Sequence, residues 1–242
     1  KPTKHSLALS SPHFRNKPWT RLAKRTNPGK ELTHMKVIAI NGSPRVNGNT
    51  GAALKVMTDE LERQGIETET IQVGNRNIHG CTACGVCSTS EGRRCMFSDD
   101  CCNEVTQKMR DADGFILGAP TYYGGMPGPM KSFLDRALFS TSTGFRGKVA
   151  TGVVAVRRAG GVDVLHQLNN FLNLAQTVTP PSQYWTLAYG LHKDEIAGDG
   201  EGIQTLVKHA RAMAWLLKLI DAGKDTYPYP EDEPRILTNF IR

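Results

Sequence analysis

Residues 36–50 read KVIAINGSPRVNGNT, a short apolar run that passes directly into a polar turn with two glycines. The first six residues are rich in β-branched side chains and are typical of a buried strand. From about Thr50 to Gln64 the apolar residues recur with helical spacing, and Gly65 is a typical helix stop. This part of the chain therefore predicts a strand, a loop and a helix in succession.

The same alternation of strand and helix patterns continues along the chain. Strand patterns occupy residues 66–73, 114–119, 148–156 and 183–189, and helix patterns occupy about 101–112, 127–139, 162–175 and 202–222. The first of these strands alternates apolar and polar residues, as an edge strand with one covered face does. Strands separated by such helices favour a parallel sheet with right-handed crossovers and helices on both faces. The sequence therefore predicts an α/β fold with a doubly wound, five-stranded parallel sheet.

The basic charge of the chain is concentrated at its amino end. The 242 residues carry a formal net charge of +7, yet residues 1–34 hold eight of the 30 Lys and Arg and one of the 23 acidic side chains. The rest of the chain is neutral, with 22 of each. We expect residues 1–34 to be a basic extension outside the fold, either a targeting or docking arm or a segment without a role, and the domain to begin at Met35.

Composition argues against two classes of partner. No apolar run approaches the roughly 20 residues that a membrane-spanning helix requires, so we expect a soluble protein with no membrane span. The aromatic side chains Phe14 and Trp19 do not alternate with basic residues in a stacking pattern, so we expect no nucleic-acid partner. We expect a cytoplasmic location, unless residues 1–34 direct the chain elsewhere.

The turn after the first predicted strand suits a phosphate group. Residues 42–50 would present unpaired backbone N–H groups, hydroxyls and the positive end of a helix dipole toward one point. The turn lacks the patterns of a triphosphate-binding loop and of a dinucleotide-binding loop. Ligands of doubly wound sheets lie beyond the carboxyl ends of the strands, where PTYYGGMP (residues 120–127) and RRAGG (residues 157–161) also stand. Their aromatic rings and glycines would let a planar ring lie against the backbone.

Together these three loops resemble the flavin loops of the iron-sulfur flavoprotein and NAD(P)H-dependent FMN reductase branch of the flavodoxin-like superfamily. The resemblance rests on GSPR followed by GNT, on PTYYGG and on the Gly-Gly turn, and it covers most of residues 35–242. It implies a flavodoxin-like sheet with strand order 2-1-3-4-5 and FMN as the cofactor. The implied phosphate contacts come from Ser43, Arg45, Asn47, Asn49 and Thr50, and the implied isoalloxazine contacts come from Pro120, Thr121, Tyr122, Tyr123, Gly124, Arg158, Ala159, Gly160 and Gly161. The alternative is that the loops are merely tight turns.

All six cysteines lie within residues 75–102, an insertion after the second predicted strand. Four of them, Cys81, Cys84, Cys87 and Cys95, are separated by two, two and seven residues. Such short loops let successive thiolates wrap one small [4Fe-4S] cluster, and the spacing is close to that of iron-sulfur flavoproteins with a longer final gap. A structural zinc site, disulfides and no metal at all are the alternatives. The last two cysteines, at a helix start, are expected to be spare thiols.

The resemblance and the cysteines imply an FMN-dependent oxidoreductase that passes electrons from a donor, ferredoxin or NAD(P)H, to a small acceptor such as a quinone. The cofactors would carry the chemistry, so the sequence assigns no catalytic side chain. One alternative is a metal-free NAD(P)H-dependent FMN or quinone reductase. Another is a flavin or redox sensor without enzyme activity.

The carboxyl end of the chain predicts an arm. We expect the flavodoxin-like domain to span residues 35–226 and the arm to occupy residues 227–242, whose prolines exclude a helix in its first half. The arm would lie either on a neighbouring subunit or over its own domain. The resemblance implies a homodimer or a homotetramer.

Overall fold

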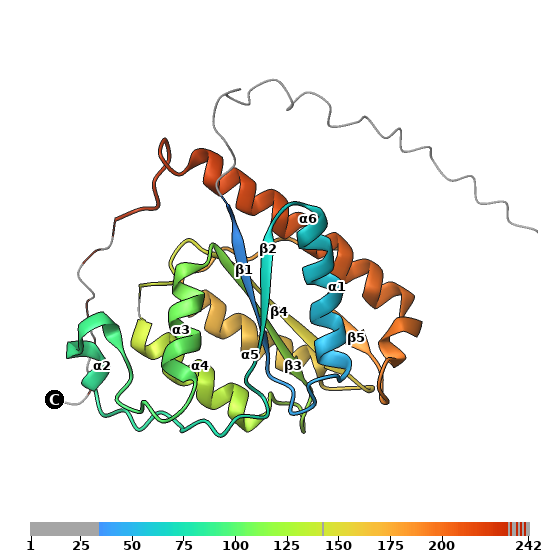
Figure 1. Cartoon of the computed structure of the whole chain (residues 1–242), viewed down its shortest axis with the longest axis horizontal. Coiled ribbons are helices and arrows are strands. Elements are labelled where there is room, and N and C mark those ends of the chain that lie inside the picture. Colours follow the sequence, from blue (N-terminus) through green and yellow to red (C-terminus); the bar gives the residue numbers. More distant parts are fainter. Residues whose placement is uncertain are drawn as a thin grey trace, which may run out of the picture. The chain divides into compact units, whose positions relative to one another are not determined.

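The computed structural model describes residues 34–141, 143–231, 233, 236, 238 and 240, so that nearly all of the expected basic extension lies outside the described residues. The strands are β1 (Lys36–Asn41), β2 (Glu67–Gln72), β3 (Gly114–Pro120), β4 (Val149–Val156) and β5 (Leu187–Tyr189). The helices are α1 (Asn49–Arg63), α2 (Val86–Thr89), α3 (Cys102–Asp111), α4 (Gly128–Thr141), α5 (Gly161–Leu174) and α6 (Gly200–Gly223), with short 3-10 helices at Glu91–Arg93 and Glu195–Gly198 (Figure 1).

The five strands form one parallel sheet in the order β2-β1-β3-β4-β5, which confirms the predicted topology. Ile38 in β1 pairs with Glu69 of β2 on one side and with Phe115 of β3 on the other. Because all strands run the same way, the loops after β1, β3, β4 and β5 meet at the carboxyl edge of the sheet. Ligands of such sheets bind there, beside the strand where the winding changes direction.

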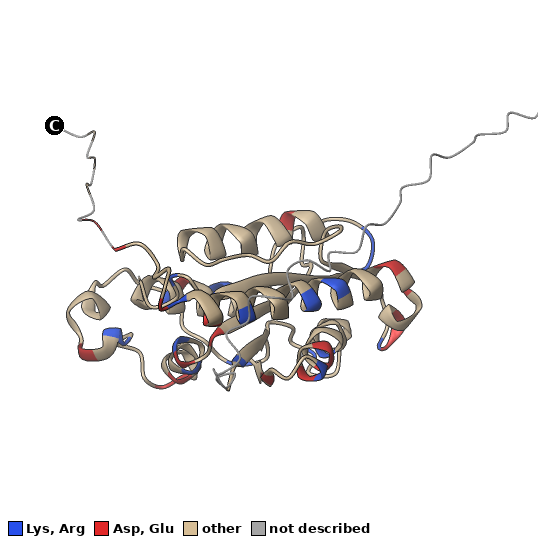
Figure 2. Cartoon of the chain, turned by 90° about the horizontal axis from the view of Figure 1, so that it is seen from above, with Lys and Arg blue, Asp and Glu red and all other residues tan. Residues whose placement is uncertain are grey.

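Both faces of the sheet are buried. Ile38 and Ile40 of β1 pack into a core with α3, α4 and α5, whereas Val37 and Ala39 pack into a second core with α1 and α6. Parallel strands covered on both faces are apolar along their whole length, and this explains the uninterrupted apolar run in KVIAIN. Figure 2 shows the sheet between its helical layers, with acidic and basic residues interspersed along the helices.

Strand β5 is shorter than predicted. The pattern predicted residues 183–189, but only Leu187–Tyr189 pair with β4. The beginning of the outer edge of β4 is already taken, since the N–H of Ala150 donates to the carbonyl oxygen of Val178 (3.1 Å). The Thr186 hydroxyl then donates to the Gly152 carbonyl oxygen (2.6 Å). Two segments, at Val178 and at residues 186–189, thus cover this edge in succession.

The opposite edge of the sheet is charged. On β2, Glu67 and Glu69 each form an ion pair with Lys36 of β1 at 3.0 Å, and Glu69 also pairs with Lys108 of α3 at 2.6 Å. Edge position and partial exposure agree with the alternating pattern of this segment. None of the helices in the described part of the chain has the length and apolar character needed to cross a bilayer.

The first residues of the C-terminal arm lie against the loop before β4. The Tyr229 ring packs on Gly147, and the guanidinium carbon of Arg146 stands 5.6 Å from the ring centroid. Most residues after 231 lie outside the described part of the chain.

Candidate functional site

Side chains from the ends of β1 and β2 and from the loop itself hold the loop after β1 in place. The Ser43 N–H donates to Asn41 Oδ1 (3.0 Å), and the Arg45 N–H donates to Ser43 Oγ (3.1 Å). Gln72, at the end of β2, donates through Nε2 to the Ser43 carbonyl oxygen. Ser43 is buried, whereas Arg45 and Asn47 are exposed. The loop therefore has a fixed inner side with one hydroxyl and an outer side with longer polar side chains.

The amino end of α1 offers unpaired hydrogen-bond donors. Its N-cap residue is Gly48, the first turn receives no bond from a capping side chain, and it contains no acidic residue. The first N–H groups of a helix have no partner within the helix, and the helix dipole adds positive potential there. Thr50 is buried in this turn, and Ser43 Oγ lies 3.7 Å from where a Cβ on Gly48 would stand. This arrangement suits a phosphate group.

Asn49 ties α1 to the loop after β5. Its Nδ2 donates to the carbonyl oxygen of His192 (2.9 Å), while its Oδ1 is buried without a partner among the described residues. Glu195 in turn accepts from the backbone N–H groups of Leu191 (2.7 Å) and His192 (2.8 Å). The loop after β5 therefore belongs to the site, although the sequence patterns did not indicate it.

The loop after β3 is a tight turn that displays an aromatic ring. Tyr122 and Gly125 exchange two backbone hydrogen bonds of 2.8 Å. Between them, Tyr123 and Gly124 have φ angles of 49° and 75°, as a two-residue hairpin turn requires. Tyrosine rarely adopts a positive φ, and the Tyr123 side chain is fully exposed. The turn thus holds one ring in solvent beside the carboxyl edge of the sheet.

Gln167 of α5 fixes this turn. Its Nε2 donates to the Gly124 carbonyl oxygen (3.1 Å), and its Oε1 accepts from the Met126 N–H (3.3 Å). One side chain therefore bonds both sides of the turn. Sequence patterns did not identify Gln167, because it lies inside a helix more than 40 residues from the loop that it holds.

The loops after β3 and β4 are in direct contact. Gly160 has a φ of 82°, and a Cβ at this position would lie 3.2 Å from Thr121 Cγ2 and 3.3 Å from Gly124 Cα. Glycine is therefore required both by the backbone conformation and by the close approach. The Thr121 hydroxyl oxygen is buried and lacks a hydrogen-bond partner within the described residues. Buried hydroxyls are usually hydrogen-bonded, so this one is available to a polar atom of a bound molecule. Arg158 and Ala159 are exposed at the rim of this loop.

The four predicted cluster ligands line one pocket. Cys87 is buried, Cys95 is half-buried, and Cys81 and Cys84 are exposed. Burial raises the pKa of the Cys87 thiol, and the other three thiols raise it further. The four sulfurs line one pocket, and a bound cation would compensate the charge that deprotonation of their thiols creates, so the donor set suits a metal centre.

The four thiols do not converge into a compact group of ligand atoms. Among the described residues, one group of three metal-ligating side chains has its ligand atoms within 4.8 Å of one another, and it consists of His79, Asp99 and Asp100. No three of the thiols meet this limit.

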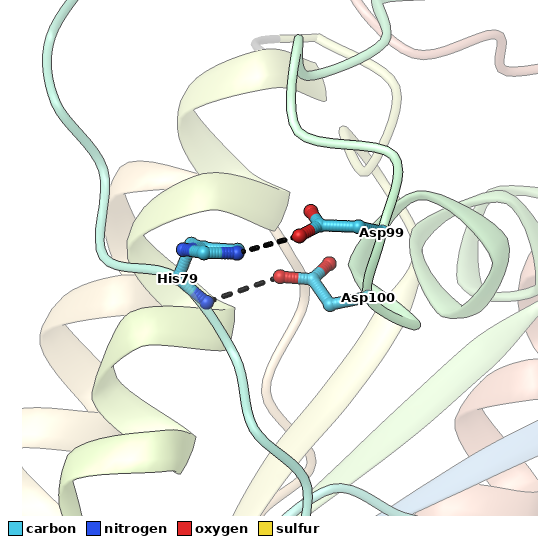
Figure 3. A group of neighbouring side chains, drawn as sticks. All are labelled: His79, Asp99 and Asp100. Atoms are coloured by element: carbon cyan, nitrogen blue, oxygen red, sulfur yellow. Dashed lines mark hydrogen bonds and ion pairs between the residues drawn. The ribbon is translucent and has the colours of Figure 1, made fainter.

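His79 is hydrogen-bonded to both Asp99 and Asp100, through its ring and its backbone N–H respectively (Figure 3). His79 Nε2 lies 2.9 Å from Asp99 Oδ2, and this bond lowers the pKa of Asp99. The His79 N–H donates to Asp100 Oδ2 (3.0 Å), and the Cys102 N–H at the start of α3 donates to Asp100 Oδ1 (3.0 Å). These bonds fasten the beginning of the cysteine loop to its end.

Arg136 of α4 contacts the same loop. Its side chain is fully buried and pairs with Asp100. Burial alone would raise the pKa of Asp100, but the Arg136 guanidinium and the N–H groups of Cys102 and His79 together outweigh it and hold that pKa below its ordinary value. The sequence patterns did not indicate Arg136, because it lies 36 residues from its partner.

Residues 35–192 match the sequence profile of a family described as NADPH-dependent FMN reductase. The chain belongs to this family. The match begins just before β1 and ends in the loop after β5, so it includes the three predicted flavin loops and the cysteine loop. The chain is therefore a flavin-dependent oxidoreductase, as the sequence predicted.

Two relatives of this FMN reductase family member are called iron-sulfur flavoproteins. One, from Methanocaldococcus jannaschii, is 32% identical over 196 residues, which cover 77% of this chain and 99% of the relative. The other, from Methanosarcina thermophila, is 28% identical over 196 residues, covering 79% and 100% of the two chains. Both matches extend beyond the flavin loops to nearly the full length of the relative.

A solved structure supports the fold of this family member. RosB, crystallised with a bound 8-demethyl-8-formylriboflavin-5'-phosphate intermediate, superposes with a TM-score of 0.57 at 18% identity. The superposition covers 86% of this chain and 92% of RosB. At this identity the likeness shows a shared flavodoxin-like fold.

Proposed function

We propose that the chain is an electron-transfer flavoprotein that binds FMN at the carboxyl edge of the sheet and a [4Fe-4S] cluster at Cys81, Cys84, Cys87 and Cys95. The observation that carries the proposal is the pocket shared by these four thiols, whose spacing along the chain suits one small cluster, in a chain of the FMN reductase family. Electrons would pass from ferredoxin or NAD(P)H to a small acceptor.

The FMN phosphate would lie at the amino end of α1. Backbone N–H groups of the first turn and the hydroxyls of Ser43 and Thr50 would donate to it, with Arg45 and Asn47 at the exposed rim. Asn49 would position this end of the helix through its bond to the loop after β5.

The flavin ring would lie on the loops after β3 and β4. The remaining predicted contacts are Pro120, Thr121, Tyr122, Tyr123, Gly124, Arg158, Ala159, Gly160 and Gly161, and the unpaired Thr121 hydroxyl fits the polar edge of such a ring. Bound FMN supplies hydride and single-electron chemistry, and a cluster supplies single-electron chemistry. The protein's own groups hold the ring, with Gln167 keeping the turn at residues 122–125 in position.

The decisive experiment is an anaerobic ultraviolet-visible spectrum of freshly purified protein, with iron, sulfide and zinc measured per FMN. We expect a broad absorbance beneath the flavin bands and about four irons per chain. A flavin spectrum without iron, persisting after anaerobic reconstitution, would instead support a metal-free NAD(P)H-dependent FMN or quinone reductase. The NADPH in the family's description favours this second candidate. A protein without flavin would refute both.

Thr50→Ala is expected to weaken FMN binding by about tenfold or more. A hydrogen bond to a charged group contributes roughly 1.5–3 kcal/mol, and about 1.4 kcal/mol corresponds to a tenfold change in affinity. Titration of the apoprotein with FMN, followed by quenching of flavin fluorescence, measures the change. An unchanged dissociation constant would remove Thr50 from the site.

Gln167→Ala is expected to weaken FMN binding by about tenfold, because it removes two hydrogen bonds that each contribute roughly 0.5–1.5 kcal/mol to holding the turn. The same fluorescence titration measures it. The control is His166→Ala, the exposed neighbour on α5, which should bind FMN like the unaltered protein. Equal affinities for all three proteins would show that the turn does not depend on Gln167.

Two further properties belong to the proposal. We propose a homodimer or homotetramer, supported by exposed apolar side chains such as Trp215 and Leu219, one turn apart on α6. We also propose a cytoplasmic location, because six cysteines without a disulfide, four of them proposed cluster ligands, suit a reducing compartment.

A further inference from the structure

Arg136 bonds the cysteine loop at four points. Its Nε donates to Cys95 Sγ (3.2 Å), Nη1 donates to the His79 carbonyl oxygen (3.3 Å) and to Asp100, and Nη2 donates to the Phe97 carbonyl oxygen (3.0 Å). These partners stand before the first cluster cysteine and at and after the last one. One side chain of α4 therefore closes the loop around the thiol pocket, which it also lines.

The Arg136 guanidinium is buried away from solvent. The side chains of Arg136 and Asp100 are 0% and 2% exposed, and the Phe97 ring covers the guanidinium carbon at 5.4 Å while stacking on His79 at 4.7 Å. Burying an ion pair is unfavourable unless its remaining hydrogen bonds are made. Here they are made to backbone groups and, at Nε, to a sulfur.

An ion pair that served packing alone would have no need for a sulfur partner. The Nε of Arg136 donates to the one cluster cysteine that stands after the seven-residue gap, and that gap is the part of the motif with the least local constraint. A buried positive charge near a sulfur is only weakly screened, so it acts on that sulfur more strongly than an exposed charge does.

We propose that Arg136 positions Cys95 as the fourth cluster ligand and raises the reduction potential of the cluster, an inference that rests on the proposed function. A reduced cluster carries one more negative charge than an oxidised one. A donor and positive charge at a ligand sulfur therefore stabilise the reduced form more, and net charge and hydrogen bonds to the sulfurs are known to set cluster potentials. Asp100 opposes this effect with its negative charge on the far side of the guanidinium.

The pair allows a test in which two substitutions shift the potential in opposite directions. Asp100→Asn removes the opposing charge and should raise the midpoint potential. Adding Arg136→Gln in that background removes the guanidinium without leaving a buried, unpaired carboxylate, and should lower the potential below that of the single variant. Arg94→Gln is the control, since Arg94 is adjacent to Cys95 in the chain but exposed, and it should leave the potential unchanged.

The proteins are reconstituted anaerobically with ferrous iron and sulfide and titrated with dithionite, and the reduced cluster is followed by electron paramagnetic resonance. FMN content of each variant shows that the domain is folded.

A higher potential in Asp100→Asn and a lower one in the double variant than in Asp100→Asn would support the role of Arg136. Equal potentials in Asp100→Asn and the double variant would overturn it, even with the cluster present. A double variant that keeps FMN but binds no iron would support the positioning of Cys95, and the sign of the Asp100→Asn shift would then decide the effect of charge. An unaltered protein that binds FMN but no cluster would refute the proposed function and this inference together.

Discussion

Replacing Cys87 by serine is expected to leave a chain that binds FMN normally but holds almost no iron. Cys87 is the most deeply buried of the four thiols in the pocket, and a serine hydroxyl stays protonated where a thiolate would bind iron. Loss of one of four ligands should reduce the iron content from about four atoms per chain to less than about one. Because the flavin loops lie in other segments, their FMN content should not change.

Iron and FMN analysis after anaerobic reconstitution measures this result. The matched control is Cys101→Ser, which alters a half-buried thiol of the same loop that does not line the pocket. It should retain its iron. Full iron content in Cys87→Ser would remove Cys87 from the ligands, and equal loss in both variants would point to general damage to the loop.

Gly48→Asp is expected to lower FMN affinity by about a hundredfold, the equivalent of roughly 2.7 kcal/mol. An aspartate at this N-cap would bond the free N–H groups of α1 itself, and its charge would repel the phosphate. The backbone of Gly48, with φ −91°, accepts any residue. Its new Cβ would lie 3.0 Å from Arg45 Cβ and 3.3 Å from the Arg45 carbonyl oxygen, so the loop must give way by a few tenths of an ångström.

The same substitution should change the stability of the apoprotein little, because aspartate is a better N-cap than glycine by a few tenths of a kcal/mol and this gain offsets the close approach to Arg45. Thermal unfolding of the apoprotein and FMN titration together separate the effect on stability from the effect on binding. Gly48→Asn, which caps without charge, should weaken FMN binding less. Unchanged FMN affinity in Gly48→Asp would place the phosphate elsewhere.

The fold could be predicted from the sequence because the apolar pattern that determines each strand or helix lies within that segment. Each strand buried on both faces is a continuous apolar run, as in residues 36–41 and 149–156, and each helix between strands has its own apolar spacing. Strand β5 was predicted too long because the pattern of residues 183–189 carries no information about its neighbour. Only the structure shows that Val178 already occupies the beginning of the edge of β4.

The site could be predicted where function depends on backbone turns and failed where it depends on distant side chains. The glycines of the flavin loops and the spacing of the cysteines are visible along the chain. Gln167 and Arg136 are not, since each is an ordinary helix residue until the fold brings it to a loop some 40 residues away. Their contacts follow from packing between elements, which a single sequence does not encode in any short pattern.

The two edge strands of the sheet constrain how copies of this chain can associate. On one border the edge strand β5 is only three residues long and its Tyr189 N–H already donates to Asp199 Oδ2 (2.8 Å), and on the other the glutamates of β2 place charge where another strand would have to dock. Uncovered, uncharged borders invite strand addition between molecules and, at high concentration, fibrous aggregation. This chain therefore resists both, and any assembly that it forms would join through helices and loops rather than by continuing the sheet from one copy into the next.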